Sequence, residues 1–158
     1  KLIEEEMLKK ESSRIRYTTY RFGTISGVSS GMRFHTAVNK FCLNASIGEP
    51  ITVYKTALNQ FRPYLSLKDA FNVFKFTINQ DLFKNDIYNA LSENCTVNQI
   101  IKKIKKFKKK VRIKFVHSEI MNQLSYHVDK KKLNKEGLNL KNKISNDIKD
   151  TIKLLKNI

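Results

Sequence analysis

The sequence predicts an α/β fold, in which short strands and amphipathic helices alternate along the chain. The first indication is a set of short runs rich in β-branched and aromatic residues, the composition that strands prefer. The second is the spacing of apolar residues by three and four between those runs, which is the helical period. The third is an apolar fraction of 41% in 158 residues, with ten Phe and six Tyr, which is enough to fill a core. Alternating strands and helices are typical of α/β folds.

The first predicted elements are a helix, a strand and a loop that contains glycines. Leu2–Lys10 carries its apolar residues on one side and its charged residues on the other, which predicts a helix. Ile15–Phe22 alternates and predicts a strand. Gly23, Gly27 and Gly31 follow at a spacing of four residues. This spacing predicts a loop whose backbone approaches another group closely, and a plain flexible connection is the alternative.

Two helices and three strands are predicted for the middle of the chain. The helices are Phe34–Ala45 and Asp69–Ile78, and the strands are Ile51–Tyr54, Arg62–Leu67 and Ile87–Ala90. Gly48 and Pro50 end the first helix, because glycine accepts the left-handed conformation of a helix end and proline cannot continue a helix. Cys42 lies on the apolar face of that helix, so we expect it in the core. Asp69 is expected to cap the second helix.

The last third of the chain begins with a capping box, Thr96-Val97-Asn98-Gln99. The helix that it starts is expected to run to about Lys109 and to bury five side chains: Val97, Ile100, Ile101, Ile104 and Phe107. A strand over Val111–Val116 follows, with Phe115 expected to be buried. The segment Tyr126–Asp129, a short helix near Leu133 and a helix over Ser145–Leu155 complete the prediction.

The charge is strongly positive and leaves two interpretations open. Lys and Arg number 31 against 14 Asp and Glu, so the formal net charge is +17. Such a balance indicates an anionic partner: nucleic acid, a membrane surface or a phosphate-bearing ligand. However, 25 of the 31 are Lys, and Asn and Ile are also abundant at 15 and 16. All three residues have A/T-rich codons, so the excess of Lys is equally consistent with the base composition of a genome.

Several classes of protein are not supported by the sequence. No uncharged apolar run approaches the roughly 18 residues that span a bilayer, and we expect no membrane partner. Cys42 and Cys95 are too few for a disulfide framework or a four-ligand zinc site, so we expect reduced thiols in a cytoplasmic protein. The histidines, His35, His117 and His127, lack the spacing of metal ligands, and we expect no metal.

Four stretches of the sequence, taken in order, resemble the motifs of one enzyme family. They are YRFGTISG at 20–27, GMRF at 31–34, PITVY at 50–54 with FRPYLSLKDA at 61–70, and YNA at 88–90 with TVNQI at 96–100. The first is similar to LRxxNxYGP, the third to PIxVYGDGxQxRDFxHVxDxA and the fourth to YNVGxGxxxTxxEL. These are motifs of the extended short-chain dehydrogenases/reductases, of the nucleotide-sugar epimerase/dehydratase type, and the similarity runs over nearly the whole chain.

The resemblance implies both an architecture and a reaction. The chain would be the C-terminal part of a Rossmann-type parallel-sheet domain plus the small α/β substrate-binding domain. Residues 1–30 would end the dinucleotide-binding domain, and residues 31–158 would be mainly substrate-binding domain, with segments returning to the Rossmann sheet. Enzymes of the family transfer hydride from a sugar carbon to NAD or NADP. The complete enzyme would be an epimerase, dehydratase or reductase acting on a nucleotide-diphosphate sugar, and a homodimer is compatible with the family.

The resemblance assigns catalytic and cofactor roles to two residues. Lys1 stands at the Lys of the YxxxK motif, where it would hold the nicotinamide ribose and lower the pKa of the catalytic Tyr. That Tyr would lie four residues before Lys1, outside the sequence given. Phe22 matches a position beside the nicotinamide. Because the Gly-rich turn of the first βαβ unit is also absent, we expect residues 1–158 alone to be inactive and to bind NAD weakly.

The resemblance also assigns residues to the substrate. The expected substrate-binding residues are Thr24, Arg33, Phe34, Thr52, Val53, Tyr54 and Arg62. Arg62 would bond the diphosphate, with a surface ion pair as the alternative, and the strand that ends at Tyr54 would line the base. Thr24 stands where the family has Asn. Many members carry a second Arg near the position of residues 122–129, but this sequence has none between 113 and 158.

Two other hypotheses belong to different classes. Seven lysines between 102 and 110 could make the chain a basic nucleic-acid-binding protein. A dedicated site would carry aromatic or Arg side chains beside the lysines, and the run contains only Phe107. We therefore expect only nonspecific, salt-sensitive attraction and no specific nucleic-acid partner. An inactive fragment is the remaining hypothesis.

Overall fold

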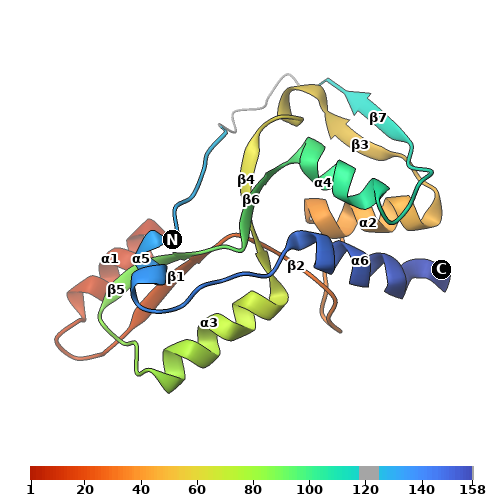
Figure 1. Ribbon diagram of the computed structural model, residues 1–158. Helices are drawn as coiled ribbons and strands as arrows, with labels where there is room; N and C mark the ends of the chain where they lie inside the picture. Colours follow the sequence, from red (N-terminus) through yellow and green to blue (C-terminus); the bar gives the residue numbers. More distant parts are fainter. Residues whose placement is uncertain (118–124, 158) are drawn as a thin grey trace.

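The computed structural model describes residues 1–117 and 125–157 and has an α/β architecture (Figure 1). The helices are α1 (Leu2–Lys10), α2 (Ala37–Ile47), α3 (Leu67–Asn79), α4 (Val97–Lys105), α5 (Lys131–Lys135) and α6 (Ile144–Leu154), with 3-10 turns η1 (Lys55–Ala57) and η2 (Leu155–Asn157). The strands are β1 (Thr18–Phe22), β2 (Thr24–Ser26), β3 (Ile51–Tyr54), β4 (Phe61–Ser66), β5 (Asp86–Ala90), β6 (Glu93–Thr96) and β7 (Ile113–Val116). The predicted α/β class is confirmed.

Strands β1 and β5 form a parallel pair that lies between α1 and α3 (Figure 1). On one face, the rings of Tyr20 and Phe22 are stacked at 5.9 Å between centroids, and Phe22 meets Phe74 of α3 edge-on at 5.6 Å. On the other face, Arg21 forms an ion pair with Glu5 of α1. Both faces of the parallel pair are therefore covered by a helix, as is usual for parallel strands. The core on the α3 side consists of Leu65, Ala70, Val73, Tyr88, Ala90, Leu133 and Leu140.

A second sheet joins β2, β4 and β6, and two of its three strands were not expected from the sequence. β2 pairs with β4 in parallel, and β4 pairs with β6 antiparallel. β2 lies inside the predicted glycine loop, because Gly23 allows the backbone to run against Pro63. A Cβ atom at Gly23 would lie 3.0 Å from the carbonyl carbon and oxygen of Pro63. The close approach predicted for Gly23 is confirmed, whereas Gly31 has open space around it.

The larger core lies where α2, α4 and α6 pack together beside the parallel pair β3–β7. Cys42 is fully buried there, as predicted. The predicted capping box of α4 is also present, with Gln99 N donating to Thr96 Oγ1 at 3.1 Å and Thr96 N donating to Gln99 Oε1 at 2.9 Å. Ile100, Ile101 and Ile104 are buried.

Two aromatic residues of this region are not buried as predicted. Phe107 is 40% exposed; it lies two residues beyond the end of α4 at Lys105, where its backbone N–H still donates to the Ile104 carbonyl oxygen at 2.9 Å. Phe115 is 52% exposed on β7, which pairs only with β3 among the described strands. The apolar stripe of α1 is exposed too, with Leu2, Ile3 and Met7 all more than 60% accessible. The spacing of apolar residues thus identified the apolar faces of these elements, but it could not show whether another element packs against each face.

Asp69 does not cap α3 as predicted. It lies inside the helix, fully buried, and accepts hydrogen bonds from Ser92 Oγ at 2.6 Å and from Asn142 N and Nδ2 at 3.1 and 2.6 Å. Its carboxylate therefore ties α3 to the turn before β6 and to the segment before α6. Ser66, the residue that precedes α3, makes no side-chain cap bond but donates to Asp147 of α6.

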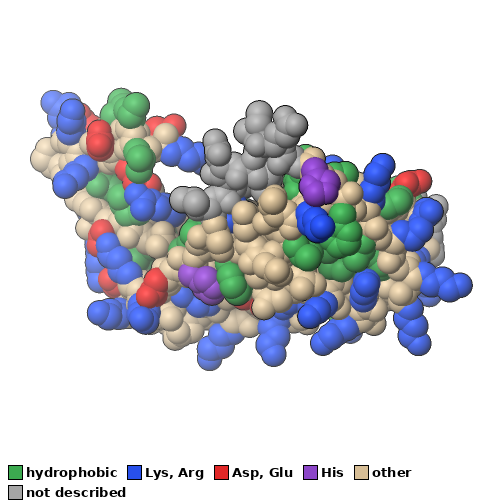
Figure 2. Space-filling model, turned by 90° about the horizontal axis from the view of Figure 1, so that it is seen from above, with side chains coloured by type: hydrophobic (Ala, Val, Ile, Leu, Met, Phe, Trp, Pro, Cys, Tyr) green, Lys and Arg blue, Asp and Glu red, His purple; other side chains and the backbone are tan. Residues whose placement is uncertain are grey.

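Charge is unevenly distributed over the surface. Figure 2 shows most of the acidic side chains of this face at the end of the molecule that carries α1, whereas Lys and Arg are spread over the whole face. Within the described residues, no helix is long and apolar enough to cross a membrane. The predicted division of the chain at residue 30 stays a prediction.

Candidate functional site

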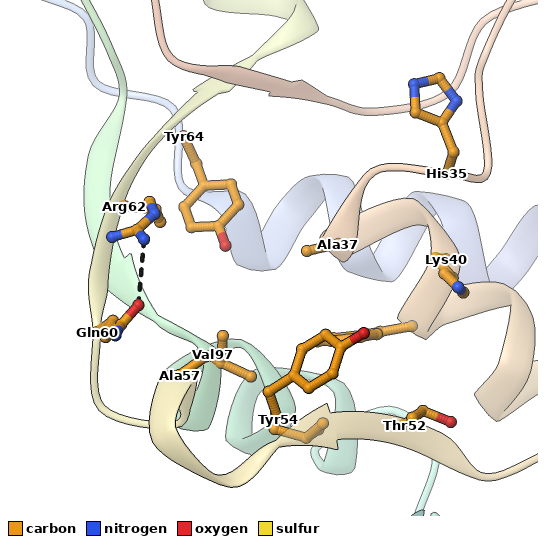
Figure 3. Close-up of a pocket in the computed structure, with 12 residues that line it drawn as sticks. His35, Ala37, Lys40, Thr52, Tyr54, Ala57, Gln60, Arg62, Tyr64 and Val97 are labelled. Atoms are coloured by element: carbon orange, nitrogen blue, oxygen red, sulfur yellow. Dashed lines mark hydrogen bonds between the residues drawn. The ribbon is translucent and has the colours of Figure 1, made fainter. Parts of the chain in front are cut away.

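A cavity of about 440 Å³ lies between β3, the start of β4 and the first turn of α2 (Figure 3). Its walls consist of His35, Ala37, Lys40, Phe41, Thr52, Val53, Tyr54, Ala57, Gln60, Arg62, Tyr64 and Val97. Four of the seven expected substrate-binding residues are among them: Thr52, Val53, Tyr54 and Arg62. The strand and the arginine are brought together because η1 turns the chain back between β3 and β4.

Arg62 is held at the edge of the cavity by several contacts. Its Nη1 donates to the backbone oxygen of Phe61 at 2.8 Å, and its Nη2 donates to Oε1 of Gln60 at 3.1 Å. The guanidinium carbon lies 5.1 Å from the centre of the Tyr126 ring, within cation–π range. These contacts fix the plane of the guanidinium, which favours bidentate binding of a phosphoryl group.

Two tyrosines, Tyr54 and Tyr64, line the cavity with their aromatic rings and each carries a polar hydroxyl group. β3 alternates, so Val53 is buried while Thr52 and Tyr54 are exposed on the cavity side. In Figure 3 the Tyr54 ring stands at the front of the cavity, and the Tyr64 hydroxyl points into it from β4. Burial raises the pKa of Tyr64 to about 12, with Cys95 acting in the same direction and Arg62 against it. Tyr64 is therefore a neutral hydroxyl at physiological pH and can donate a hydrogen bond to a ligand.

A second cavity of about 420 Å³ adjoins the first at His35, which lines both. Its walls are Thr24, Ile25, Ser26, Gly27, Ser29, Gly31, Met32, Arg33, His35, Thr36, Asn39 and Leu67. Two more of the expected residues, Thr24 and Arg33, therefore lie here, beside the glycine-containing segment. Phe34 lines neither cavity. The expected substrate residues thus form two neighbouring groups rather than one.

The residues expected to bind the dinucleotide do not form a site in the described part of the chain. The Lys1 side chain is 99% exposed and lines none of the described cavities. Phe22 lines two other cavities, an apolar one of about 820 Å³ along α3 and a polar one of about 370 Å³ beside Asp129. Lys1 and Phe22 therefore share none of the described cavities, and the cofactor roles expected of them stay predictions. No group of three metal-binding side chains occurs in residues 1–117 and 125–157.

Sequence reasoning missed four polar residues of the first cavity: His35, Lys40, Gln60 and Tyr64. Tyr64 is part of the stretch that carries the family resemblance, and His35 directly follows another such stretch. Lys40 could have been placed from its helical spacing, since it lies three residues after Ala37 on the same side of α2. Gln60 belongs to no motif and to no apolar pattern, so the sequence does not mark it as a cavity residue. In the structure it lines the cavity and accepts a hydrogen bond from Arg62.

No family model matches the sequence. The fold, however, is found in solved enzymes. UDP-glucose 4-epimerase from Thermotoga maritima, solved with UDP-glucose, is 18% identical, with a TM-score of 0.81 over 99% of this chain and 52% of that one. UDP-glucuronic acid 4-epimerase from Bacillus cereus, solved with UDP-glucuronic acid and NAD, is 16% identical, with a TM-score of 0.85 over 99% of this chain and 51% of that one.

A dehydratase has the same fold. dTDP-glucose 4,6-dehydratase from Bacillus anthracis, solved with NAD, is 15% identical, with a TM-score of 0.79 over 98% of this chain and 49% of that one. The chain thus spans about half the length of these structures. It has the fold of the C-terminal half of extended short-chain dehydrogenases/reductases of the epimerase/dehydratase type, as the sequence motifs predict.

Proposed function

We propose that residues 1–158 form the nucleotide-sugar-binding portion of an NAD(P)-dependent epimerase, dehydratase or reductase. Residues 1–30 would finish the dinucleotide-binding domain, and the rest would be mainly the substrate-binding domain. The observation that carries the proposal is the first cavity, which combines the β3 wall with Arg62. Its apolar and aromatic lining suits a base, and its cations suit a diphosphate.

Binding rather than turnover is the activity to test in this chain. Lys1 has no Tyr partner within the sequence, so the hydride transfer of a complete enzyme is not expected from residues 1–158. The cavity of about 440 Å³ is within the range of small-molecule sites. Eight of its twelve lining residues come from α2, β3 and β4, and two more come from the turn between β3 and β4.

The experiment is a calorimetric titration of residues 1–158 with UDP-glucose. Arg62→Ala should weaken binding by about 2–3 kcal/mol, the scale of lost hydrogen bonds to a charged group. Arg14→Ala is the matched control, because Arg14 is 80% exposed, forms an ion pair with Glu11 three residues away and lines none of the described cavities. Failure of the unmutated chain to bind, or equal binding by the Arg62→Ala variant, would contradict the proposal.

A further inference from the structure

Residues 125–130 belong to no helix or strand, yet each of them contacts β4, β5, β6 or the turn between β5 and β6. Ser125 Oγ accepts a hydrogen bond from Phe61 N at 3.0 Å, and Tyr126 N donates to the Phe61 oxygen at 3.4 Å. The rings of His127 and Phe61 lie 4.1 Å apart, measured between centroids. This segment, which we call the strap, therefore lies against the start of β4.

The middle of the strap is held by two asparagine side chains. Asn94 of β6 donates from Nδ2 to the Val128 oxygen at 3.0 Å, and its Oδ1 accepts from Val128 N at 3.1 Å. Asn89 of β5 donates from Nδ2 to the Asp129 oxygen at 3.1 Å. These side chains bond the main chain of the strap much as a neighbouring strand would.

Lys130 anchors the end of the strap. Its ammonium group donates to three main-chain oxygens, those of Leu91 at 3.1 Å, Ser92 at 2.9 Å and Leu140 at 2.8 Å. An ammonium group has three N–H donors, so these bonds use all of them. No other lysine in residues 1–117 and 125–157 donates to three main-chain oxygens. The strap is therefore fixed to the turn between β5 and β6 and to the segment before α6.

Tyr126 brings the strap into contact with Arg62. The guanidinium carbon lies over the Tyr126 ring, 5.1 Å from its centre, and the Phe61 oxygen accepts from both Arg62 Nη1 and Tyr126 N. A guanidinium that rests on a ring by its face keeps the N–H groups of its edge for other acceptors. Arg62 lines the first cavity (Figure 3), whereas no residue of the strap is among the residues that line it. Tyr126 can therefore act on a ligand of that cavity through Arg62.

We propose that the strap positions Arg62 for the ligand of the first cavity, with Tyr126 as the residue that holds the guanidinium and Lys130 as the anchor that holds the strap. This inference rests on the proposed function and adds to it two positioning residues that lie outside the cavity and that no motif identifies. A long side chain that is already held in one conformation loses less entropy when a ligand binds. The Tyr126 ring thus raises the affinity of the site without touching the ligand.

The test titrates UDP-glucose into variants of residues 1–158. Tyr126→Leu removes the ring and should weaken binding about two- to fivefold, the scale of a cation–π contact at a partly exposed site. Tyr126→Phe keeps the ring and should bind within about twofold of the unmutated chain. Adding Tyr126→Leu to Arg62→Ala should cause no further loss, because the ring acts only through Arg62.

A second pair of variants tests the anchor. Lys130→Met should weaken UDP-glucose binding about twofold, and no more than Tyr126→Leu does, because the anchor acts through Tyr126. Lys131→Met is the matched control, since it removes the same charge from the next residue, whose side chain is 84% exposed and lines none of the described cavities. Circular dichroism melts show whether each variant is folded. If Lys130→Met does not fold, Asn94→Ala, which releases Val128, replaces it.

The outcomes separate this inference from the proposed function. If Arg62→Ala weakens UDP-glucose binding and Tyr126→Leu does not, the site stands and the strap has no positioning role. A loss in Tyr126→Leu that persists in the Arg62→Ala background would show that the ring contacts the ligand directly, which also overturns the inference. Equal losses in Lys130→Met and Lys131→Met would reflect net charge and contradict the role of the anchor. If the unmutated chain does not bind UDP-glucose, both proposals fail.

Discussion

Ser26 Oγ donates a hydrogen bond of 2.8 Å to Oδ2 of Asp147, although 121 residues separate them in the sequence. Ser66, the register partner of Ser26 across β2 and β4, donates to the other carboxylate oxygen at 2.9 Å. All three residues are buried. One carboxylate of α6 therefore holds together the ends of two parallel strands, and Ser26 also lines the second cavity.

Removing this carboxylate should destabilise the fold. Asp147→Ala leaves the hydroxyls of Ser26 and Ser66 buried without their acceptor, so we expect a loss of about 2–3 kcal/mol in the free energy of unfolding. Urea unfolding followed by circular dichroism measures it. Asp150→Ala is the control on the same helix, because Asp150 is 46% exposed and pairs loosely with Lys68 at 3.5 Å. Similar losses in both variants would contradict the role given to the buried network.

Asp147 also predicts a pH dependence of stability. Burial raises its pKa above the usual 3.8, against the two serine hydrogen bonds and Lys68. A carboxyl whose pKa is higher in the folded state contributes stability that is fully present below the unfolded value and is lost as pH rises through the folded value. Asp147→Asn has no such titration, and its amide can still bond the serines. The chain should therefore lose stability relative to Asp147→Asn as the pH rises above about 4, the ordinary pKa of an Asp carboxyl, and a pH-independent difference would contradict this prediction.

Gly23 should tolerate no side chain. A Cβ atom there would lie 3.0 Å from two backbone atoms of Pro63 and 3.1 Å from a backbone atom of Tyr64, none of which can move without shifting β4. We expect Gly23→Ala to cost about 1–3 kcal/mol of unfolding free energy, the scale of overpacking. Gly31→Ala is the control, because nothing lies within 4 Å of its Cβ position. Urea unfolding of the two variants should differ, and equal midpoints would show that β2 adjusts freely.

The capping box of α4 provides a local test. Thr96→Ala removes the acceptor of the Gln99 N–H, so we expect a loss of about 1 kcal/mol, while Thr96→Ser keeps the hydroxyl and should lose much less. Thermal unfolding of the two variants measures the difference. If Ser and Ala were equally destabilising at this position, the methyl group of Thr96 rather than its hydrogen bond would account for the effect.

Local patterns explain which elements could be predicted. α1 and β3 have the predicted bounds, and α4 begins at the predicted cap, because each of these depends on neighbouring residues alone. β6, Glu93–Thr96, has a polar sequence with no alternation and forms only because β4 lies beside it. Phe107 illustrates the limit of periodicity, since the apolar spacing continues after the helix has ended.

The candidate site was predicted only in part, for a similar reason. The motif resemblance selected Arg62 and the β3 strand, which line one cavity. It also selected Thr24 and Arg33, which line the neighbouring one. Lys40 was not selected, although it lies three residues after Ala37 on α2, because no motif includes it and its position relative to Arg62 depends on how α2 packs against β3 and β4.

The lysine run tests the competing nucleic-acid hypothesis. Ile100, Ile101 and Ile104 are buried, so the lysines of α4 form its outer face, where attraction to polyanions is nonspecific and screened by salt. Phe107 and Phe115 are exposed, contrary to prediction, and exposed aromatic rings beside lysines are the feature that a single-strand-binding surface needs.

We nevertheless expect nucleic-acid binding to be weak at physiological salt, because Arg112 is the only Arg between residues 96 and 116. Titration of residues 1–158 with single-stranded DNA and RNA at about 150 mM salt, where the screening length is roughly 8 Å, measures it. Phe107→Ala should leave the residual affinity unchanged if the attraction is purely electrostatic. Submicromolar affinity at that salt concentration, a preference for one sequence, or a clear loss in Phe107→Ala would favour the nucleic-acid-binding protein over the nucleotide-sugar enzyme.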